Sequence, residues 1–286
     1  MKRLSIYLIT CFLISLFFIS CSQKTIKTEE KDLVKKYYLS SDTTLGALSV
    51  DIEVEIPVAF ADTNALKAVR KTIITNLFGE DYVSVKNDSI VQQFCAELHK
   101  EYKDNFVPLL KVKDTKNNYS FNNEHKLLGF SLLSDKNIYV YGIERYVDMG
   151  GAHGLETRNF YNFDLKTGKQ ILEADIFKAD YKSKLSELIK VRIVEESKED
   201  STDNNTEPIL SLEDTDYWTD SIKPNGNFYI TDEGINYVFN PFEIAPDYVG
   251  QTEVTLPYNR IKDFLKPSSL ITYLVEKQAK QKPDSK

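Results

Sequence analysis

The chain has 286 residues, 42% of them hydrophobic, and a formal net charge of −7. It is long enough to bury a sizeable core without the help of disulfides. The acidic balance disfavours nucleic acid and anionic lipid as partners. Only three histidines are present, which excludes a histidine-rich metal site, and we expect neither a metal nor a cofactor.

The first 21 residues resemble the signal peptide of a bacterial lipoprotein. Lys2 and Arg3 precede an uncharged apolar run that ends at Ser20 and Cys21. The length of this run lies between that of a signal peptide and that of a membrane span, so length alone does not decide. The small residue before the cysteine favours cleavage before Cys21 and lipidation of its thiol. A plain membrane helix with an incidental cysteine is the alternative.

Cleavage would leave an exported chain with a net charge of about −9, anchored to a membrane and facing the periplasm or the cell surface. Residues 1–20 would be the signal peptide, and the polar, aromatic-free residues 21–36 would form a lipidated tether. Cys95 would then be the only cysteine besides Cys21, so no internal disulfide is expected. Its place on an apolar helix face predicts a buried, unreactive thiol.

One strand and two helices are predicted between residues 37 and 115. Apolar residues alternate with acidic ones over residues 50–58, which is typical of a half-buried strand, and Pro57 favours an edge position. Two stretches with apolar residues at helical spacing follow. Their expected limits are Asp62 or Thr63 and Gly79 for the first helix, and Asp88 and Pro108 for the second.

Period-two patterns dominate the next part of the chain, with strands expected around residues 128–132, 138–140 and 160–165. A helix over about 181–196, a polar surface loop at 197–208 and a hairpin around Gly234 follow. A last strand at 254–256, a short helix from Asn259 and a polar tail at 271–286 complete the chain. Strands and helices come in blocks, which predicts an α+β fold with mostly antiparallel sheet, packed helices and two subdomains, residues 37–115 and 116–270.

An unusual segment, Tyr146 to Gly154, carries glycines on both sides of a histidine. Glycine pairs permit positive φ and close approach of a ligand. Asp148, Gly150, Gly151 and His153 are therefore the candidate ligand-binding residues. His153 could act as an acid, a base or a ligand beside Asp148, or it could close the turn by bonding to backbone. The residues alone do not decide, although the structural role is the simpler one.

From this segment onward the chain resembles the PdaC/RsiV-like superfamily, a domain of unknown function. The resemblance covers about residues 125–265. It rests on Gly-Gly-Ala-His-Gly at 150–154, Phe-Asp-Leu at 163–165, Thr-Gly-Lys at 167–169, Asp-Ile-Phe at 175–177, Gly-Ile at 234–235, Phe-Asn-Pro-Phe-Glu-Ile-Ala-Pro at 239–246, Gly250 and Leu-Pro-Tyr at 256–258.

The resemblance implies a non-enzymatic module of the cell envelope that binds or senses peptidoglycan or an envelope-directed protein such as lysozyme. A cationic lysozyme would suit the negative charge of the chain. The sigma-binding segment and the catalytic domain of those relatives have no counterpart in the sequence. The alternative is an unrecognised hydrolase or deacetylase of envelope glycans that uses His153, Asp148 and Glu144, although no complete catalytic motif is present.

Two Asp-Ser-aliphatic triplets resemble the O-glycan acceptor of exported Bacteroidota proteins. They place candidate acceptor hydroxyls at Ser89 and Ser221. An added sugar requires an accessible position, and both serines are expected in loops.

Overall fold

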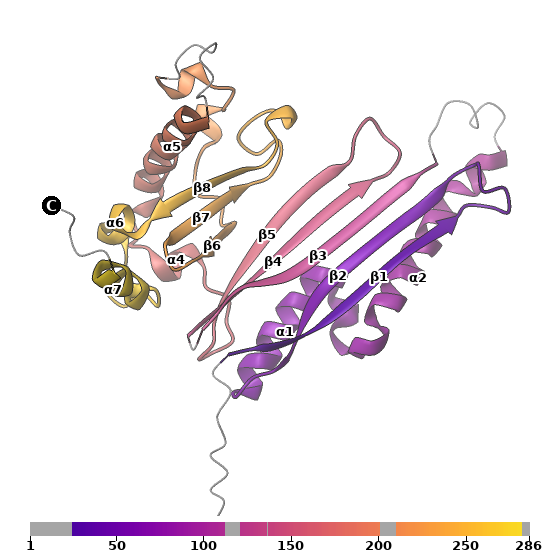
Figure 1. The fold of residues 1–286 in the computed structure, drawn as a ribbon, viewed down its shortest axis with the longest axis horizontal. Coiled ribbons are helices and arrows are strands. Elements are labelled where there is room, and N and C mark those ends of the chain that lie inside the picture. Colours follow the sequence, from indigo (N-terminus) through magenta and orange to yellow (C-terminus); the bar gives the residue numbers. More distant parts are fainter. Residues whose placement is uncertain (1–24, 112–120, 136, 201–209, 282–286) are drawn as a thin grey trace, which may run out of the picture.

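The computed structural model describes residues 25–111, 121–135, 137–200 and 210–281 (Figure 1). It confirms the α+β class, with one sheet of five strands in the order β1-β2-β3-β4-β5 and a second of three in the order β6-β7-β8. Cys21 and the expected signal peptide lie outside the described residues. None of the helices in the described part is long and apolar enough to cross a membrane.

The larger sheet is antiparallel except at one pairing. Its strands are β1 (Lys27–Tyr38), β2 (Ala47–Ala59), β3 (Asn123–Ser134), β4 (Ile138–Asp148) and β5 (Leu155–Asp164). β2 and β3 run parallel, with Leu48 opposite Asn123 and Val54 opposite Gly129. A parallel pair needs a long crossover, and the two helices between β2 and β3 provide it.

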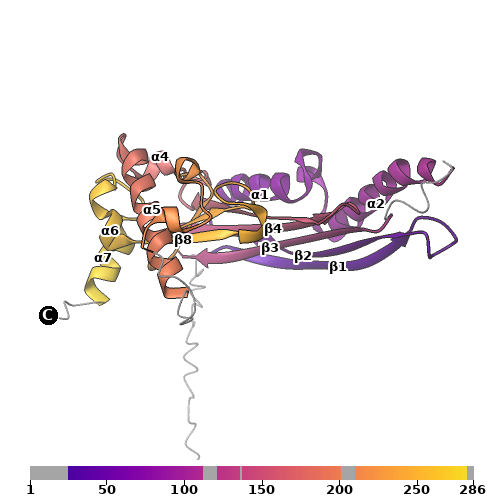
Figure 2. The same cartoon turned by 90° about the horizontal axis from the view of Figure 1, so that it is seen from above.

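Helices α1 (Thr63–Phe78) and α2 (Asn87–Phe106) lie on the same side of this sheet (Figure 2). The Asp62 side chain accepts hydrogen bonds from the backbone N–H groups of Asn64 and Ala65, so it caps α1 as the sequence predicts. The buried residues of both helices join the inward-facing residues of the strands in one hydrophobic core. Cys95 is fully buried there, as predicted, and burial raises the pKa of its thiol to about 11.

The rest of the chain builds a second core around the smaller sheet. Its elements are α4 (Glu173–Ile176), α5 (Tyr181–Asp200), β6 (Phe228–Ile230), β7 (Gly234–Phe239), β8 (Thr252–Pro257), α6 (Tyr258–Ile261) and α7 (Thr272–Gln281). Short 3-10 helices span Glu80–Ser84, Pro108–Lys111, Leu212–Asp214, Thr219–Ser221, Asp247–Val249 and Lys262–Phe264.

Three asparagine side chains join the two sheets at the outer edge of β5. Asn162 donates to the Phe228 carbonyl and accepts from the Ile230 N–H. Asn227 and Asn240 accept from the N–H groups of Phe160 and Arg158, at 3.0 and 2.7 Å. Side-chain amides thus take the place of a backbone ladder, and the second subdomain is fixed against β5.

Several expectations about the N-terminal half are corrected. Residues 27–36, expected in the tether, belong to β1, which pairs with β2 along its whole length. β2 is therefore not an edge strand, and Pro57 is tolerated at a bulge near its end, opposite Thr28. Helix α2 begins at Asn87 without a capping side chain, and Asp88, the predicted cap, lies in its first turn.

The two-subdomain expectation agrees with the two cores, but the expected division between residues 115 and 116 falls inside the larger sheet. The first core ends near Leu165 and the second begins near Ile171, apart from Ile138 and Val140 of β4. The expected polar tail also contributes to the fold, since Ile271 and Leu274 are buried in the second core.

Candidate binding surface

One face of the larger sheet carries charged side chains and faces away from α1 and α2. Because side chains alternate along a strand, Asp51 and Glu53 of β2 are exposed while their neighbours Val50 and Ile52 are buried. Strand register extends this face across the sheet. Asp51 lies opposite Lys126 of β3, Lys126 lies opposite Tyr146 of β4, and Tyr146 lies opposite Glu156 of β5.

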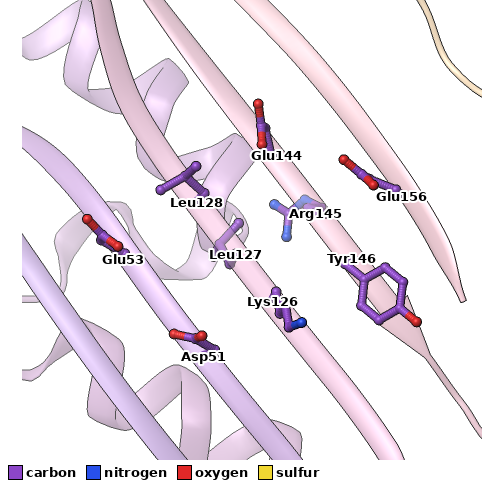
Figure 3. Close-up of a pocket in the computed structure, with 9 residues that line it drawn as sticks. All are labelled: Asp51, Glu53, Lys126, Leu127, Leu128, Glu144, Arg145, Tyr146 and Glu156. Atoms are coloured by element: carbon purple, nitrogen blue, oxygen red, sulfur yellow. The ribbon is translucent and has the colours of Figure 1, made fainter. Parts of the chain in front are cut away.

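We call this surface the open face; it consists of Asp51, Glu53, Lys126, Leu128, Glu144, Tyr146 and Glu156 (Figure 3). It contains a shallow depression of about 480 Å³, whose floor also includes Leu127 and Arg145. Four acidic side chains therefore surround one lysine on a surface that is wide enough for a protein side chain or loop to enter.

Lys126 of the open face and its neighbour Arg158 are already paired with carboxylates, and Arg145 donates instead to the carbonyl groups of Asn76 and Leu77 in α1. Lys126 Nζ lies 2.9 Å from a Glu124 carboxylate oxygen and 5.4 Å from the centre of the Tyr146 ring, and its hydrogen bond to Glu124 raises the pKa of Lys126. Arg158 Nε lies 2.7 Å from Glu144. Among the described residues, Asp51 and Glu53 form no ion pair. The free charge of the open face is therefore negative.

The predicted ligand-binding residues lie in the loop that joins β4 to β5. Asp148 ends β4 opposite Glu124, at the margin of the open face, and its carboxylate accepts from the Gly150 N–H at 2.7 Å. His153 is exposed, and its Nδ1 lies 3.1 Å from the Gly154 carbonyl oxygen. Its Nε2 lies 3.9 Å from Asp247 in the β7–β8 loop. The described contacts include none between His153 and Asp148.

The glycines of this loop have different roles. Gly150 adopts a φ of +77°, as the glycine pattern predicts, whereas Gly151 does not require positive φ and a side chain there would meet open space. Gly154 is restricted by packing instead, because an added Cβ would lie 2.4 Å from the Tyr146 ring. The loop is thus a turn that presents His153 toward the second subdomain.

The residues of the alternative hydrolase site are not brought together. Glu144 is paired with Arg158, and Asp148 lies four residues further along the same strand, a separation of about 13 Å. Two carboxylates that cooperate in glycoside hydrolysis lie roughly 5–9.5 Å apart. The described residues also contain no cluster of histidine, cysteine, aspartate and glutamate suited to a metal ion.

The comparisons with known proteins agree with the resemblance found in the sequence. The model of a family described as a protein of unknown function, DUF3298, matches residues 174–259. The chain carries a DUF3298 domain of the PdaC/RsiV-like type. A crystal structure of a DUF3298 family member from Bacteroides fragilis is 25% identical, covers 87% of this chain and 97% of its own, and superimposes with a TM-score of 0.77.

Two proteins of Bacillus subtilis are also similar to this chain. The peptidoglycan-N-acetylmuramic acid deacetylase PdaC is 25% identical over 63% of this chain and 36% of its own length. The anti-sigma-V factor RsiV is 28% identical over 43% of this chain and 42% of its own. The chain therefore matches less than half of either protein.

The matched DUF3298 segment and the open face are different parts of the molecule. Residues 174–259 contain α5 and the smaller sheet, whereas the open face comes entirely from β2 to β5. The open face was only partly predictable, because the alternation over residues 50–58 reveals a polar side of β2 but not which strands flank it.

The candidate glycosylation sites are not in loops. Ser89 lies in the first turn of α2, where its hydroxyl donates to the Lys86 carbonyl and accepts from Gln93. Ser221 ends a 3-10 helix. Both are half-buried, so glycosylation stays a prediction, which the intact mass of the native protein tests.

Proposed function

We propose that the chain is a non-enzymatic lipoprotein of the cell envelope that binds or senses a cationic, envelope-directed protein, such as a lysozyme, through the open face. The observation that carries this proposal is the acidic surface of β2 to β5, which none of the described helices covers (Figure 2) and whose neighbouring cations Lys126 and Arg158 are paired with carboxylates. Opposite charge accelerates encounter and fixes the orientation of the two partners.

The relatives support an envelope setting without defining the activity of this chain. One is a peptidoglycan deacetylase and the other an anti-sigma factor, and the described residues of this chain contain no group of histidine, cysteine, aspartate and glutamate that could hold a metal ion. Peptidoglycan is the second ligand that the resemblance implies.

Lysozyme binding is tested by surface plasmon resonance with the whole chain over a series of salt concentrations. We expect higher salt to slow association more than it changes dissociation, because charges attract over a Debye length of about 10 Å at 0.1 M salt. At any one salt concentration, the variant with Asp51→Lys and Glu53→Lys should associate with lysozyme more slowly than the unmodified chain. Its matched control, with Asp263→Lys and Glu276→Lys, makes the same change in net charge at exposed positions of the second subdomain.

The control variant distinguishes the effect of the open face from the effect of the net charge of the chain. Equal slowing by both double variants would mean that net charge alone attracts lysozyme, and no measurable binding by the unmodified chain would contradict the proposal. Release of reducing sugar or acetate from purified sacculi, lost in His153→Ala, would favour the hydrolase instead.

Membrane anchoring through Cys21 is part of the proposal and has its own test. Replacing Cys21 with Ala should abolish lipidation and leave the precursor uncleaved by a lipoprotein signal peptidase. A mature chain that appears in membrane-free fractions with a start elsewhere would contradict the predicted lipid anchor.

A further inference from the structure

Exposed aromatic side chains are concentrated in one part of the second subdomain. Among the described residues, Trp218, Phe242 and Tyr248 are 43%, 53% and 74% exposed, and Tyr38 of β1 is the only other large aromatic in this class. We call residues 216–218 and 240–250 the aromatic loops. They lie in or beside the β7–β8 connection and inside the segment matched by the DUF3298 family.

The aromatic loops are firmly held although their rings are exposed. The Trp218 N–H donates to the Ile244 carbonyl at 2.7 Å, which ties the two segments together. Ile244 and Ala245 are buried in the subdomain. The Asp216 carboxylate beside the Tyr248 hydroxyl raises the pKa of Tyr248, so the two segments also lie close together at this point. A ligand would therefore meet rings that are already positioned, which lowers the entropic cost of binding.

Phe242 has a backbone conformation that its side chain does not favour. Its φ is +66°, and it is the only residue other than glycine with positive φ in the described part of the chain. A bulky residue in this region costs on the order of 1 kcal/mol or more. The ring is half exposed, so packing does not explain why phenylalanine occupies the position. Strain that directs an apolar ring into solvent is typical of a binding site.

Acidic residues neighbour the aromatic ones in the sequence of the aromatic loops. The Glu243 carboxylate accepts from Asn225 at 2.8 Å, and Asp247 faces His153 of the β4–β5 loop. A lipid or an apolar protein surface would require a continuous apolar patch, and an anionic polymer would be repelled by these carboxylates. Sugar rings present apolar C–H faces beside hydroxyl groups, which fits exposed aromatic faces interspersed with hydrogen-bond acceptors.

We infer that the aromatic loops bind an uncharged glycan built of N-acetylated hexosamine units, with Trp218, Phe242 and Tyr248 stacking on successive sugar faces. This inference rests on the proposed function, in which peptidoglycan is the second ligand, and it assigns the uncharged sugar strand of that polymer, rather than its charged peptides, a surface of its own. The open face would then take a cationic protein while the aromatic loops hold the glycan.

The sequence provides a direct probe, because Trp218 is its single tryptophan. The whole chain, in micelles of a detergent without a sugar headgroup, is titrated with a hexamer of N-acetylglucosamine. We expect the tryptophan emission to shift and saturate. Tyr248→Ala and Phe242→Gly should each weaken binding about tenfold, which corresponds to the loss of one good aromatic contact. Tyr38→Ala, which removes a ring of β1 that is 44% exposed, should bind as the unmodified chain does.

Trp218→Phe keeps an aromatic face at this position but removes the fluorescent probe. Sedimentation of this variant with chitin checks the result without fluorescence. No emission change and no sedimentation would overturn the inference, and so would equal losses in Tyr248→Ala and Tyr38→Ala. Binding of a cationic peptide that Tyr248→Ala weakens, together with no binding of the hexamer, would assign the aromatic loops to a protein partner and would also overturn the inference. Glycan binding with no lysozyme binding would support the inference and refute the cationic partner; the opposite pattern would do the reverse.

Discussion

The Asn162 side chain of β5 donates a hydrogen bond to the Phe228 carbonyl of β6 at 2.7 Å, across the junction of the two sheets. The same amide accepts from the Ile230 N–H at 2.9 Å, and Asn162 is itself buried. One side chain thus satisfies a donor and an acceptor of a strand with which β5 forms no ladder. The position of the DUF3298 segment relative to the open face depends on this amide.

Replacing Asn162 with Leu should therefore destabilise the protein by about 3 kcal/mol, because it leaves one buried N–H and one buried carbonyl without partners. Urea unfolding measures the change. Asn159→Leu, a half-buried asparagine on the same strand, is the matched control and should change the free energy of unfolding by less than about 1 kcal/mol. Similar losses in both variants would mean that the junction does not depend on the Asn162 amide.

Local features of the sequence predicted the helices well and the sheet order poorly. The cap at Asp62, the buried Cys95 and the hairpin at β6 and β7 all depend on residues close in the chain. β1 was missed because its sequence, Lys27 to Tyr38, is mostly charged, and its stability comes from the ladder with β2 rather than from apolar periodicity. The parallel pairing of β2 with β3 joins segments some 75 residues apart, which no local pattern records.

Like the fold, the candidate site was predictable from the sequence only in its local features. The glycines around His153 correctly indicated a tight loop, but the residues that the loop approaches, Asp247 and Tyr146, are set by tertiary packing. The acidic open face required the register of four strands. The aromatic loops were not distinguishable from core aromatics, because only the structure shows that the Phe242 ring is exposed at a positive φ.

In the β4–β5 loop, Gly151 and Gly154 are expected to differ in how well they tolerate a side chain. Gly154→Ala should lower the melting temperature slightly, because the new methyl group would overlap the outer end of the Tyr146 ring and turn that side chain aside at a cost of about 1 kcal/mol. Gly151→Ala should be nearly neutral, since nothing lies within 4 Å of the added atom. His153→Ala should cost on the order of 1 kcal/mol at most. Thermal melts of the three variants decide, and a larger loss in Gly151→Ala than in Gly154→Ala would contradict the packing argument.

The stability of the N-terminal subdomain should depend on pH through His99. Its ring stacks on Tyr37 with centroids 4.2 Å apart, and its Nε2 is buried without a hydrogen-bond partner. Burial, reinforced by Lys103 and Lys35, lowers the pKa of His99 in the folded state. The folded protein then binds fewer protons than the unfolded chain, so the free energy of unfolding falls as pH decreases through about 6.5, the unfolded value.

Urea unfolding between pH 7.5 and pH 5 measures this slope. His99→Phe keeps a ring against Tyr37 and should reduce the slope of stability against pH. The part due to His125 should remain, because burial also lowers the pKa of His125. Tyr37→Phe is the control, because it preserves the stacked pair and the titrating imidazole, and it should retain the slope. An unchanged slope in His99→Phe would show that His99 titrates alike in the folded and unfolded states.

Phe242 provides the most direct test of whether a strained residue is kept for the fold or for a ligand. Asparagine tolerates positive φ and glycine prefers it, whereas a β-branched residue disfavours it. Relief of strain should offset the loss of a half-exposed ring, so Phe242→Asn and Phe242→Gly should change the free energy of unfolding by no more than about 1 kcal/mol. Phe242→Val, which keeps the strain and loses the ring, should be less stable than Phe242→Asn by about 1–2 kcal/mol.

Urea denaturation of the three variants measures these differences, and the hexamer titration is repeated on each. All three should lose glycan affinity to a similar extent, because each lacks the ring, while only Phe242→Val loses appreciable stability. Equal destabilisation in all three would instead assign the ring to the packing of the β7–β8 loop. If the free energy of unfolding and the affinity for the hexamer fall together in all three variants, the positive φ serves the fold. Phe242 would then not be a residue that contacts the glycan.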